Sequence, residues 1–187
     1  MKLRMLTFTM IASGMLVLPA AGMAQSGTTT APAPMQSSAA QELDGDDKDF
    51  LENAAQSGHA EIEGSKMAQS KAMSAEVKAF AQQMIEDHTR VSEELTALAK
   101  SKGYTPPTEP SIVQRTKLKA LSAMDDGFDE SYADQIGVEA HEDAVELFKE
   151  AAAEAEDPDI KAFAAKTLPG LEKHLEMARN LKTKVDK

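Results

Sequence analysis

The sequence contains no cysteine and no tryptophan, and only two tyrosines and six phenylalanines among its 187 residues. The lack of cysteine excludes disulfide bonds, thiolate metal ligands and a lipid-modified cysteine. The few aromatic rings offer little to stack on bases, and a net charge of −11 repels phosphate backbones, so we expect no nucleic acid partner. No stretch alternates polar and apolar residues long enough to predict a strand, which leaves an all-α fold.

Long apolar runs are also missing, except near the start of the sequence. Lys2 and Arg4 precede an apolar run from Met5 to Leu16, and small residues follow up to Ala24. This pattern predicts a secretory signal peptide over residues 1–24. Since no later segment is long enough to span a bilayer, we expect a periplasmic or secreted protein without a transmembrane segment in its mature form.

Residues 25–44 are mostly Ser, Thr, Ala, Pro and Gln, with almost no large hydrophobic residue. Such a composition cannot bury enough surface to offset the entropy of ordering, so it predicts a disordered tether. The remaining residues, 45–187, are numerous enough to form one domain with a core of its own.

Apolar repeats and end signals predict four long helices. Ser74 and Asp157 are typical N-caps, Pro158 suits a first helical position and Gly103 suits a helix end. Short joins pair the helices as two antiparallel hairpins, and the longer segment between them, which carries one short helix, can return along the bundle. The predicted helices span residues 46–70, 74–102, 111–123, 128–156 and 157–184. The fold class predicted is therefore a monomeric, left-handed four-helix bundle of two helical hairpins with a crossover connection.

An internal repeat supports the two hairpins. The residues from Val77 to Ala81 read Val-Lys-Ala-Phe-Ala, and those from Ile160 to Ala164 read Ile-Lys-Ala-Phe-Ala. Each copy lies near the start of the second helix of its hairpin. The two hairpins are thus related in sequence as well as in predicted structure.

Three histidines and one glutamate lie on the apolar faces of the four long helices, near the middle of each. These residues are Glu61, His88, His141 and His174, one on each helix in that order. Burying one such group without a partner costs roughly a few kcal/mol. Four of them at one level of a bundle therefore predict that they satisfy one another, directly or through a bound ion.

Three imidazoles and a carboxylate suit zinc, iron or manganese, and copper is also compatible with these ligands. We expect one divalent metal ion, zinc or iron, bound by Glu61, His88, His141 and His174. The alternative is that each histidine is a core residue bonded to a hydroxyl or a backbone carbonyl, with Glu61 paired to one of them. 

Three polar residues near the histidines, Asp87, Asp134 and Gln135, are candidates to support the metal ligands from outside. His59, the fourth histidine, lies two residues before Glu61 and is expected on an exposed face.

Several short motifs are shared with a known family. They are Asp49-Phe50, Ala60-Glu61 with Gly64, Asp87-His88, Phe128-Asp129 and Leu168-Pro169-x-Leu171-x-x-His174. Through them, residues 44–184 resemble the secreted bacterial family called domain of unknown function 4142. The resemblance implies a ferritin-like four-helix bundle and an exported location. 

The chain departs from the di-iron pattern of ferritin-like proteins. In those proteins a glutamate stands three residues before a histidine on two helices, whereas this chain has Ile85 and Leu171 at those positions. A single-ion site is therefore favoured over a di-iron centre.

Two functions remain open. The first is a non-enzymatic exported protein that binds a metal ion or an envelope protein partner, in a stress-related role. The alternative is a metal-dependent oxidoreductase acting on oxygen species, which would need a route for its substrate. A histidine layer sealed by Phe80, Met84, Val138 and Phe163 would favour the binding function.

Overall fold

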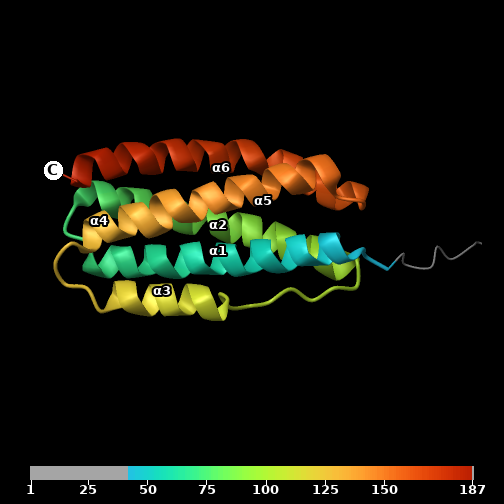
Figure 1. Cartoon of the computed structure of the whole chain (residues 1–187), viewed down its shortest axis with the longest axis horizontal. Helices are drawn as coiled ribbons and strands as arrows, with labels where there is room; N and C mark the ends of the chain where they lie inside the picture. The colour runs from blue at the N-terminus through green and yellow to red at the C-terminus, as the bar shows by residue number, and fades with distance from the viewer. Residues whose placement is uncertain (1–41, 187) are drawn as a thin grey trace, which may run out of the picture. The chain divides into compact units, whose positions relative to one another are not determined.

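Residues 42–186 are the part of the chain that the computed structural model describes, and they contain no strand (Figure 1). The predicted signal peptide, and the predicted tether up to residue 41, lie outside the described residues. The elements are α1 (Gly45–Lys71), α2 (Ala75–Ser101), α3 (Ile112–Ser122), α4 (Phe128–Tyr132), the π-helical segment η1 (Ala133–Glu139), α5 (Ala140–Glu154) and α6 (Pro158–Val185). No helix within residues 42–186 is long and apolar enough to cross a membrane.

The helices begin where local chemistry favours a start. The Ser74 side chain accepts hydrogen bonds from the backbone amides at the start of α2, and the Asp157 side chain does the same for α6. In α3, Ser111 and Gln114 form a capping box, in which each side chain bonds the other's backbone amide. The N-caps predicted at Ser74 and Asp157 are confirmed, and the short helix begins after Ser111 as expected.

Two hairpins joined by a crossover form the bundle, as predicted. Helix α1 packs along α2, and α5 along α6, while α2 also packs on α6 and α1 on α5. The connection between the hairpins carries α3, which runs beside α1 (Figure 1). All four long helices therefore face one shared core.

The predicted third helix, 128–156, is continuous in space but not uniform, because α4 passes into α5 through the π-helical segment η1. This irregularity was not predicted from the sequence. Two glycines allow η1 to pack closely against neighbouring helices. A Cβ atom at Gly64 would lie 2.9 Å from the Ile136 side chain, and one at Gly137 would lie 3.2 Å from the Cβ atom of Ala178. The wider helical segment therefore fits between α1 and α6 because these positions carry no side chain.

Each hairpin stabilises the turn of the other through a side chain that accepts hydrogen bonds from the turn's backbone amides. Asp47, in the first turn of α1, accepts hydrogen bonds from the backbone amides of Glu156 at 3.2 Å and Asp157 at 2.8 Å. Asp129, in the first turn of α4, accepts from the amides of Met73 and Ser74, the latter at 2.7 Å. Each hairpin's first helix thus fixes the turn of the other hairpin, which extends the relation seen in the sequence repeat.

The core consists of two apolar clusters. One includes Phe50, Phe148 and Phe163 near the turn between α5 and α6. The other includes Phe80 and Tyr132 near the turn between α1 and α2. On each long helix, the polar residue predicted to ligate a metal lies where the residues of one cluster give way to those of the other.

Candidate metal centre

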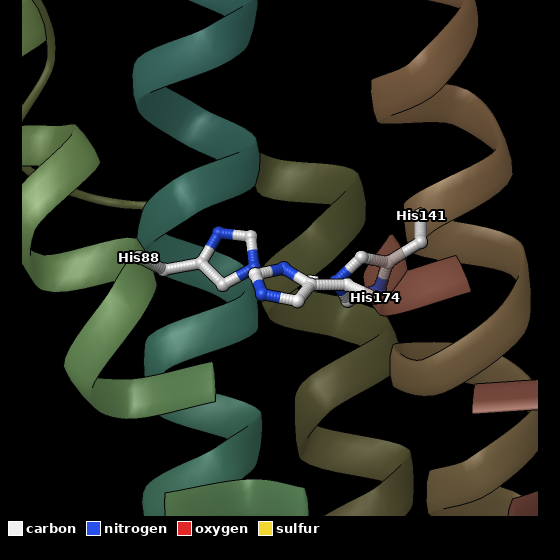
Figure 2. A group of neighbouring side chains, drawn as sticks. All are labelled: His88, His141 and His174. Atoms are coloured by element: carbon white, nitrogen blue, oxygen red, sulfur yellow. Dashed lines mark hydrogen bonds between the residues drawn. The ribbon is translucent and has the colours of Figure 1, made fainter. Parts of the chain in front are cut away.

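The structure brings together all four residues predicted to form the site. Glu61 lies on α1, His88 on α2, His141 on α5 and His174 on α6, and their exposed fractions are 2%, 3%, 0% and 8%. Figure 2 shows the three imidazole rings directed toward one another from their separate helices. One nitrogen from each ring lies within 4.8 Å of the others.

His88 connects the carboxylate to the other histidines. Its Nδ1 lies 2.8 Å from Oε2 of Glu61, and its Nε2 lies 3.2 Å from Nε2 of His141. Because a carboxylate only accepts hydrogen bonds, Nδ1 of His88 carries the donated proton. When the His88 ring is neutral, its Nε2 is therefore a lone pair that faces His141.

His141 is held by a backbone carbonyl that the π-helical segment releases. In a regular α-helix the amide of Ala140 would bond the carbonyl of Ile136, but here it bonds the carbonyl of Gln135. The Ile136 carbonyl is then free to accept from Nδ1 of His141 at 3.1 Å. This bond leaves Nε2 of His141 as a lone pair directed at His88.

His174 is held through its Nε2 atom, whereas His88 and His141 are held through Nδ1. Its Nε2 lies 3.1 Å from Oδ2 of Asp87, a carboxylate that also contacts Gln83 and Arg90. The Nδ1 atom of His174 is buried and has no hydrogen-bonding partner among the described residues. The same is true of Oε1 of Glu61, which lies 3.8 Å from Nδ1 of His141.

The facing nitrogens of His88 and His141 require a positive charge between them. With Nδ1 protonated in both neutral rings, two Nε2 lone pairs would meet at 3.2 Å and repel each other. Either a proton on His88 or a bound metal ion removes this repulsion. The arrangement therefore suits either a protonated His88 or a bound metal ion.

The pKa values in the layer reflect burial and mutual charge. Burial acts to raise the pKa of Glu61, but the three histidines outweigh it, and this pKa lies below its ordinary value. Burial acts to lower the pKa of His88, yet the Glu61 carboxylate holds it above its ordinary value. Burial lowers the pKa of His141, and burial together with the neighbouring histidines lowers the pKa of His174 to about 4. His141 and His174 are therefore neutral at neutral pH.

The layer is covered on one side and reachable on another. The ring of Phe80 packs 6.3 Å from that of His141, and Met84 is fully buried nearby in the same apolar cluster. Between α2 and α6, however, a surface groove of about 280 Å³ is lined by His88 and His174. The complete seal that would have favoured the binding function is therefore absent on the α2–α6 side.

Two of the three predicted supporting residues do not contact the layer. Asp134 pairs with Lys182, and Gln135 lines a small surface pocket beside α3. Asp87 does support the site, but through His174 rather than its neighbour His88. The Ile136 carbonyl was not predicted, because only the π-helical hydrogen-bonding pattern frees it and no residue type marks that pattern.

Fold and site together define a four-helix bundle with a buried polar layer of three histidines and one carboxylate. The chain belongs to the family described as Domain of unknown function (DUF4142), whose model matches residues 32–181. The resemblance found in the sequence motifs is confirmed. No curated protein matches the chain.

Solved structures share the fold at low sequence identity. The crystal structure of a DUF305 fragment from Deinococcus radiodurans has a TM-score of 0.66 at 10% identity, over 76% of this chain and 98% of that chain. Structures of CopM in the Cu(I)-bound and Cu(II)-bound forms have TM-scores of 0.63 at 20% and 18% identity, over 74% of this chain and 96% of CopM. At these identities the similarity shows the fold alone.

Proposed function

We propose that this protein binds one divalent metal ion through Nε2 of His88, Nε2 of His141 and Nδ1 of His174. The observation that carries the proposal is that the opposite nitrogen of each ring already has a fixed acceptor: Glu61, the Ile136 carbonyl and Asp87. Histidines that ligate metals nearly always donate their other N–H group in this way. The three remaining nitrogens are left free to share one ion.

A metal ion accounts for the layer better than a proton does. A proton on His88 would satisfy Nε2 of His141 but would leave the buried Nδ1 of His174 without a partner. An ion between the rings uses all three nitrogens. Buried polar atoms without partners are rare in folded proteins, so the unpartnered Nδ1 of His174 favours the metal.

One pair of the donors already has the spacing of a zinc site. Two nitrogens at Zn–N distances of about 2.0–2.1 Å in tetrahedral geometry are about 3.3 Å apart, and the Nε2 atoms of His88 and His141 are 3.2 Å apart. Imidazole also suits copper, and CopM, which shares the fold, has been solved in Cu(I)-bound and Cu(II)-bound forms. Zinc is therefore our first candidate, and copper and iron are its competitors because imidazole suits both.

Glu61 acts, in this proposal, by holding His88 rather than by binding the ion. Its carboxylate lies against the Nδ1 atoms of His88 and His141, whereas the ion would lie at their Nε2 atoms. Direct ligation by Glu61, expected from the sequence, stays a separate prediction with its own test below.

The physiological role that this site supports is metal binding in the cell envelope by an exported, non-enzymatic protein. Export rests on the signal-peptide pattern of residues 1–24. The competing function is a metal-dependent oxidoreductase acting on oxygen species. A di-iron centre for it is disfavoured because Glu61 is the one carboxylate in the buried layer, and Asp47, the other buried carboxylate among the described residues, closes a turn instead.

Metal binding is tested on untagged protein isolated from the periplasm and on the purified chain titrated with Zn²⁺ and Cu²⁺ by calorimetry. We expect a stoichiometry near one, a large loss of affinity in His88→Ala and His174→Ala, and no loss in His59→Ala. His59 is a matched control because it is the one histidine outside the layer. Circular dichroism checks that each variant remains helical.

Stoichiometry near zero in the folded wild-type protein would contradict the proposal. Equal affinity in the His59 and His174 variants would also contradict it, because the ion would then lie elsewhere. Peroxide or oxygen turnover by the metal-loaded protein, lost in His141→Ala, would support the oxidoreductase instead.

A further inference from the structure

A surface groove between α2 and α6 reaches the histidine layer. It is lined by residues of both helices, including Asp87 and His88 from α2 and Gly170 and His174 from α6. His174 is the most exposed of the three histidines, at 8%, whereas His141 is fully buried. The groove therefore leads to the edge of the layer formed by His88 and His174.

An ion held by three imidazoles keeps at least one coordination position for a further ligand. A further ligand cannot approach the ion from the side of His141, because the His141 ring is fully buried and packs against Phe80. Glu61 lies at the Nδ1 atoms of His88 and His141, away from their Nε2 atoms. The remaining direction is toward α2 and α6, where His88 and His174 line the groove and Asp87 lies at Nε2 of His174.

The residues that line the groove carry a net positive charge, whereas the whole protein carries a net negative charge. The chain carries a net charge of −11, yet Arg90, Lys166 and Lys173 line the groove against two carboxylates. Arg90 pairs with Asp87 and Lys166 pairs with Glu94. Lys173 makes no ion pair with any described residue, so it leaves one uncompensated positive charge at the entrance.

We propose that the groove admits a small monovalent anion, which binds the metal ion directly at its open position. The proposal rests on the metal site proposed above and deepens it, because it assigns the class of the fourth ligand. A small anion suits the site since the groove is small where His88 and His174 line it, about 280 Å³ in all, and its uncompensated charge is a single lysine. A bulky or multiply charged ligand would meet the Asp87 and Glu94 carboxylates.

The probe is azide, added to the protein loaded with Co²⁺ in place of zinc. Tetrahedral Co²⁺ absorbs visible light strongly, and its spectrum changes when a ligand in its coordination sphere is exchanged. We expect a saturable spectral change with one azide bound per cobalt. Chloride should compete with azide, because it shares the charge and small size.

A charge variant tests the groove without touching a ligand. Lys173→Glu should weaken azide binding roughly three- to tenfold through the reversed charge near the ion. Lys119→Glu is the matched control, because Lys119 is likewise exposed and without an ion pair among the described residues, but lies on α3, which packs on α1 and α4. It should change azide affinity by less than twofold.

A pair of glycine variants tests the route itself. A Cβ atom at Gly170 would meet no atom within 4 Å, so the helix accepts a side chain there. Gly170→Leu should fill part of the groove and weaken or slow azide binding at least several-fold, whereas Gly170→Ala should leave it unchanged. Cobalt stoichiometry near one in both variants confirms that the ion itself is in place.

The outcomes separate the two proposals. If Co²⁺ does not bind the folded protein, the proposed metal site fails. If Co²⁺ binds at the three histidines but azide leaves its spectrum unchanged, the metal site stands and the anion proposal is overturned. Azide binding that is equal in wild type, Lys173→Glu and Gly170→Leu would also overturn it, because the anion would then reach the ion by another route.

Discussion

Each histidine of the layer has its two ring nitrogens assigned to different tasks. One nitrogen donates to a fixed oxygen, and the other faces the shared centre. The fixed oxygens orient the rings before any ion arrives, so little side-chain entropy remains to be lost on binding. The donors therefore resemble a preorganised site more closely than a set of unrelated core histidines.

Glu61→Gln tests whether this carboxylate acts through His88. The amide oxygen of glutamine can still accept from Nδ1 of His88, but the negative charge is lost. We expect metal affinity to fall about 10- to 100-fold, while the visible spectrum of bound Co²⁺ keeps its shape. Glu63→Gln, an exposed position two residues away, is the control and should bind normally.

A different spectral shape in Glu61→Gln would place an oxygen of Glu61 on the ion. The loss of affinity would then approach that of His88→Ala. That result would confirm the direct ligation expected from the sequence and contradict the supporting role proposed here.

The sequence predicted which residues meet but not how they divide their tasks. The three histidines could be found because each replaces a hydrophobic residue on an apolar helix face. The regular spacing of the apolar residues on such a face can be recognised in the sequence itself. These histidines are His88, His141 and His174. Which nitrogen faces inward depends on ring orientation and on Asp87, Glu61 and the Ile136 carbonyl. Those contacts join different helices or follow from the π-helical pattern, so no local pattern encodes them.

At the scale of elements, the π-helical segment η1 is the irregularity on which the site depends. It frees the Ile136 carbonyl for His141 and fits against α1 because Gly64 has no side chain. Such segments recur at functional sites because the wider turn redirects a side chain. The packing of α1 on η1 is therefore part of the site's construction.

Gly64→Ala should destabilise the protein. The added Cβ atom would lie 2.9 Å from the Ile136 side chain, and overpacking of this kind costs about 1–3 kcal/mol, which outweighs the helix-propensity gain of up to about 1 kcal/mol. Gly170→Ala is the control. Its Cβ atom meets nothing within 4 Å, so the same exchange should stabilise α6 by up to about 1 kcal/mol. Urea unfolding of the metal-free proteins measures both. Equal effects at the two positions would show that η1 does not pack tightly on α1.

The start of α6 gives a prediction of pH dependence. Partial burial acts to raise the pKa of Asp157, but hydrogen bonds from Lys102 and from the amides of Ile160 and Asp159 outweigh it, so this pKa lies below its ordinary value. A carboxyl group with a lowered folded-state pKa stabilises the fold above its unfolded pKa. That contribution is lost as the pH falls through the folded pKa.

Asp157→Asn keeps the N-cap oxygen and removes the charge. At pH 6 we expect it to lower the free energy of unfolding by roughly 0.5–1 kcal/mol, whereas Asp157→Ala should cost about 1 kcal/mol or more because the cap is lost as well. As the pH falls through the lowered folded-state pKa of Asp157, the difference between wild type and Asp157→Asn should shrink, since the wild-type carboxyl group is then protonated too. Urea unfolding with a chelator present gives both values. A difference that persists at low pH would show that the charge on Asp157 is not its source.

A helix boundary could be predicted when the interactions that set it lie within one turn of the chain. Ser74, Ser111 and Asp157 start their helices through hydrogen bonds within the first turn, and all three starts were predicted. The division of the segment 128–156 into α4, η1 and α5 was not, since its partners Gly64 and Ala178 lie on other helices. What one turn of helix determines could be predicted, and what packing determines could not.

At the scale of the whole molecule, the polar layer interrupts the hydrophobic core between its two apolar clusters. Four buried polar side chains at this level replace apolar contacts that would otherwise stabilise the bundle. Without an ion, hydrogen bonds between polar groups take the place of apolar packing at this level. A bound ion would connect α2, α5 and α6 directly and α1 through Glu61.

Metal binding should accordingly stabilise the entire bundle rather than one hairpin. At a free Zn²⁺ concentration of 100 times the Kd, linkage adds about 2.7 kcal/mol, which corresponds to a rise in Tm of about 5–10 °C for a domain of this size. Hydrogen exchange should slow in the central turns of α1, α2, α5 and α6 together, because the ligands and their support come from all four helices. His59→Ala should show the same rise and His174→Ala almost none. Protection confined to α1 and α2 would contradict a shared ion, because that pair could be stabilised by His88 and Glu61 alone.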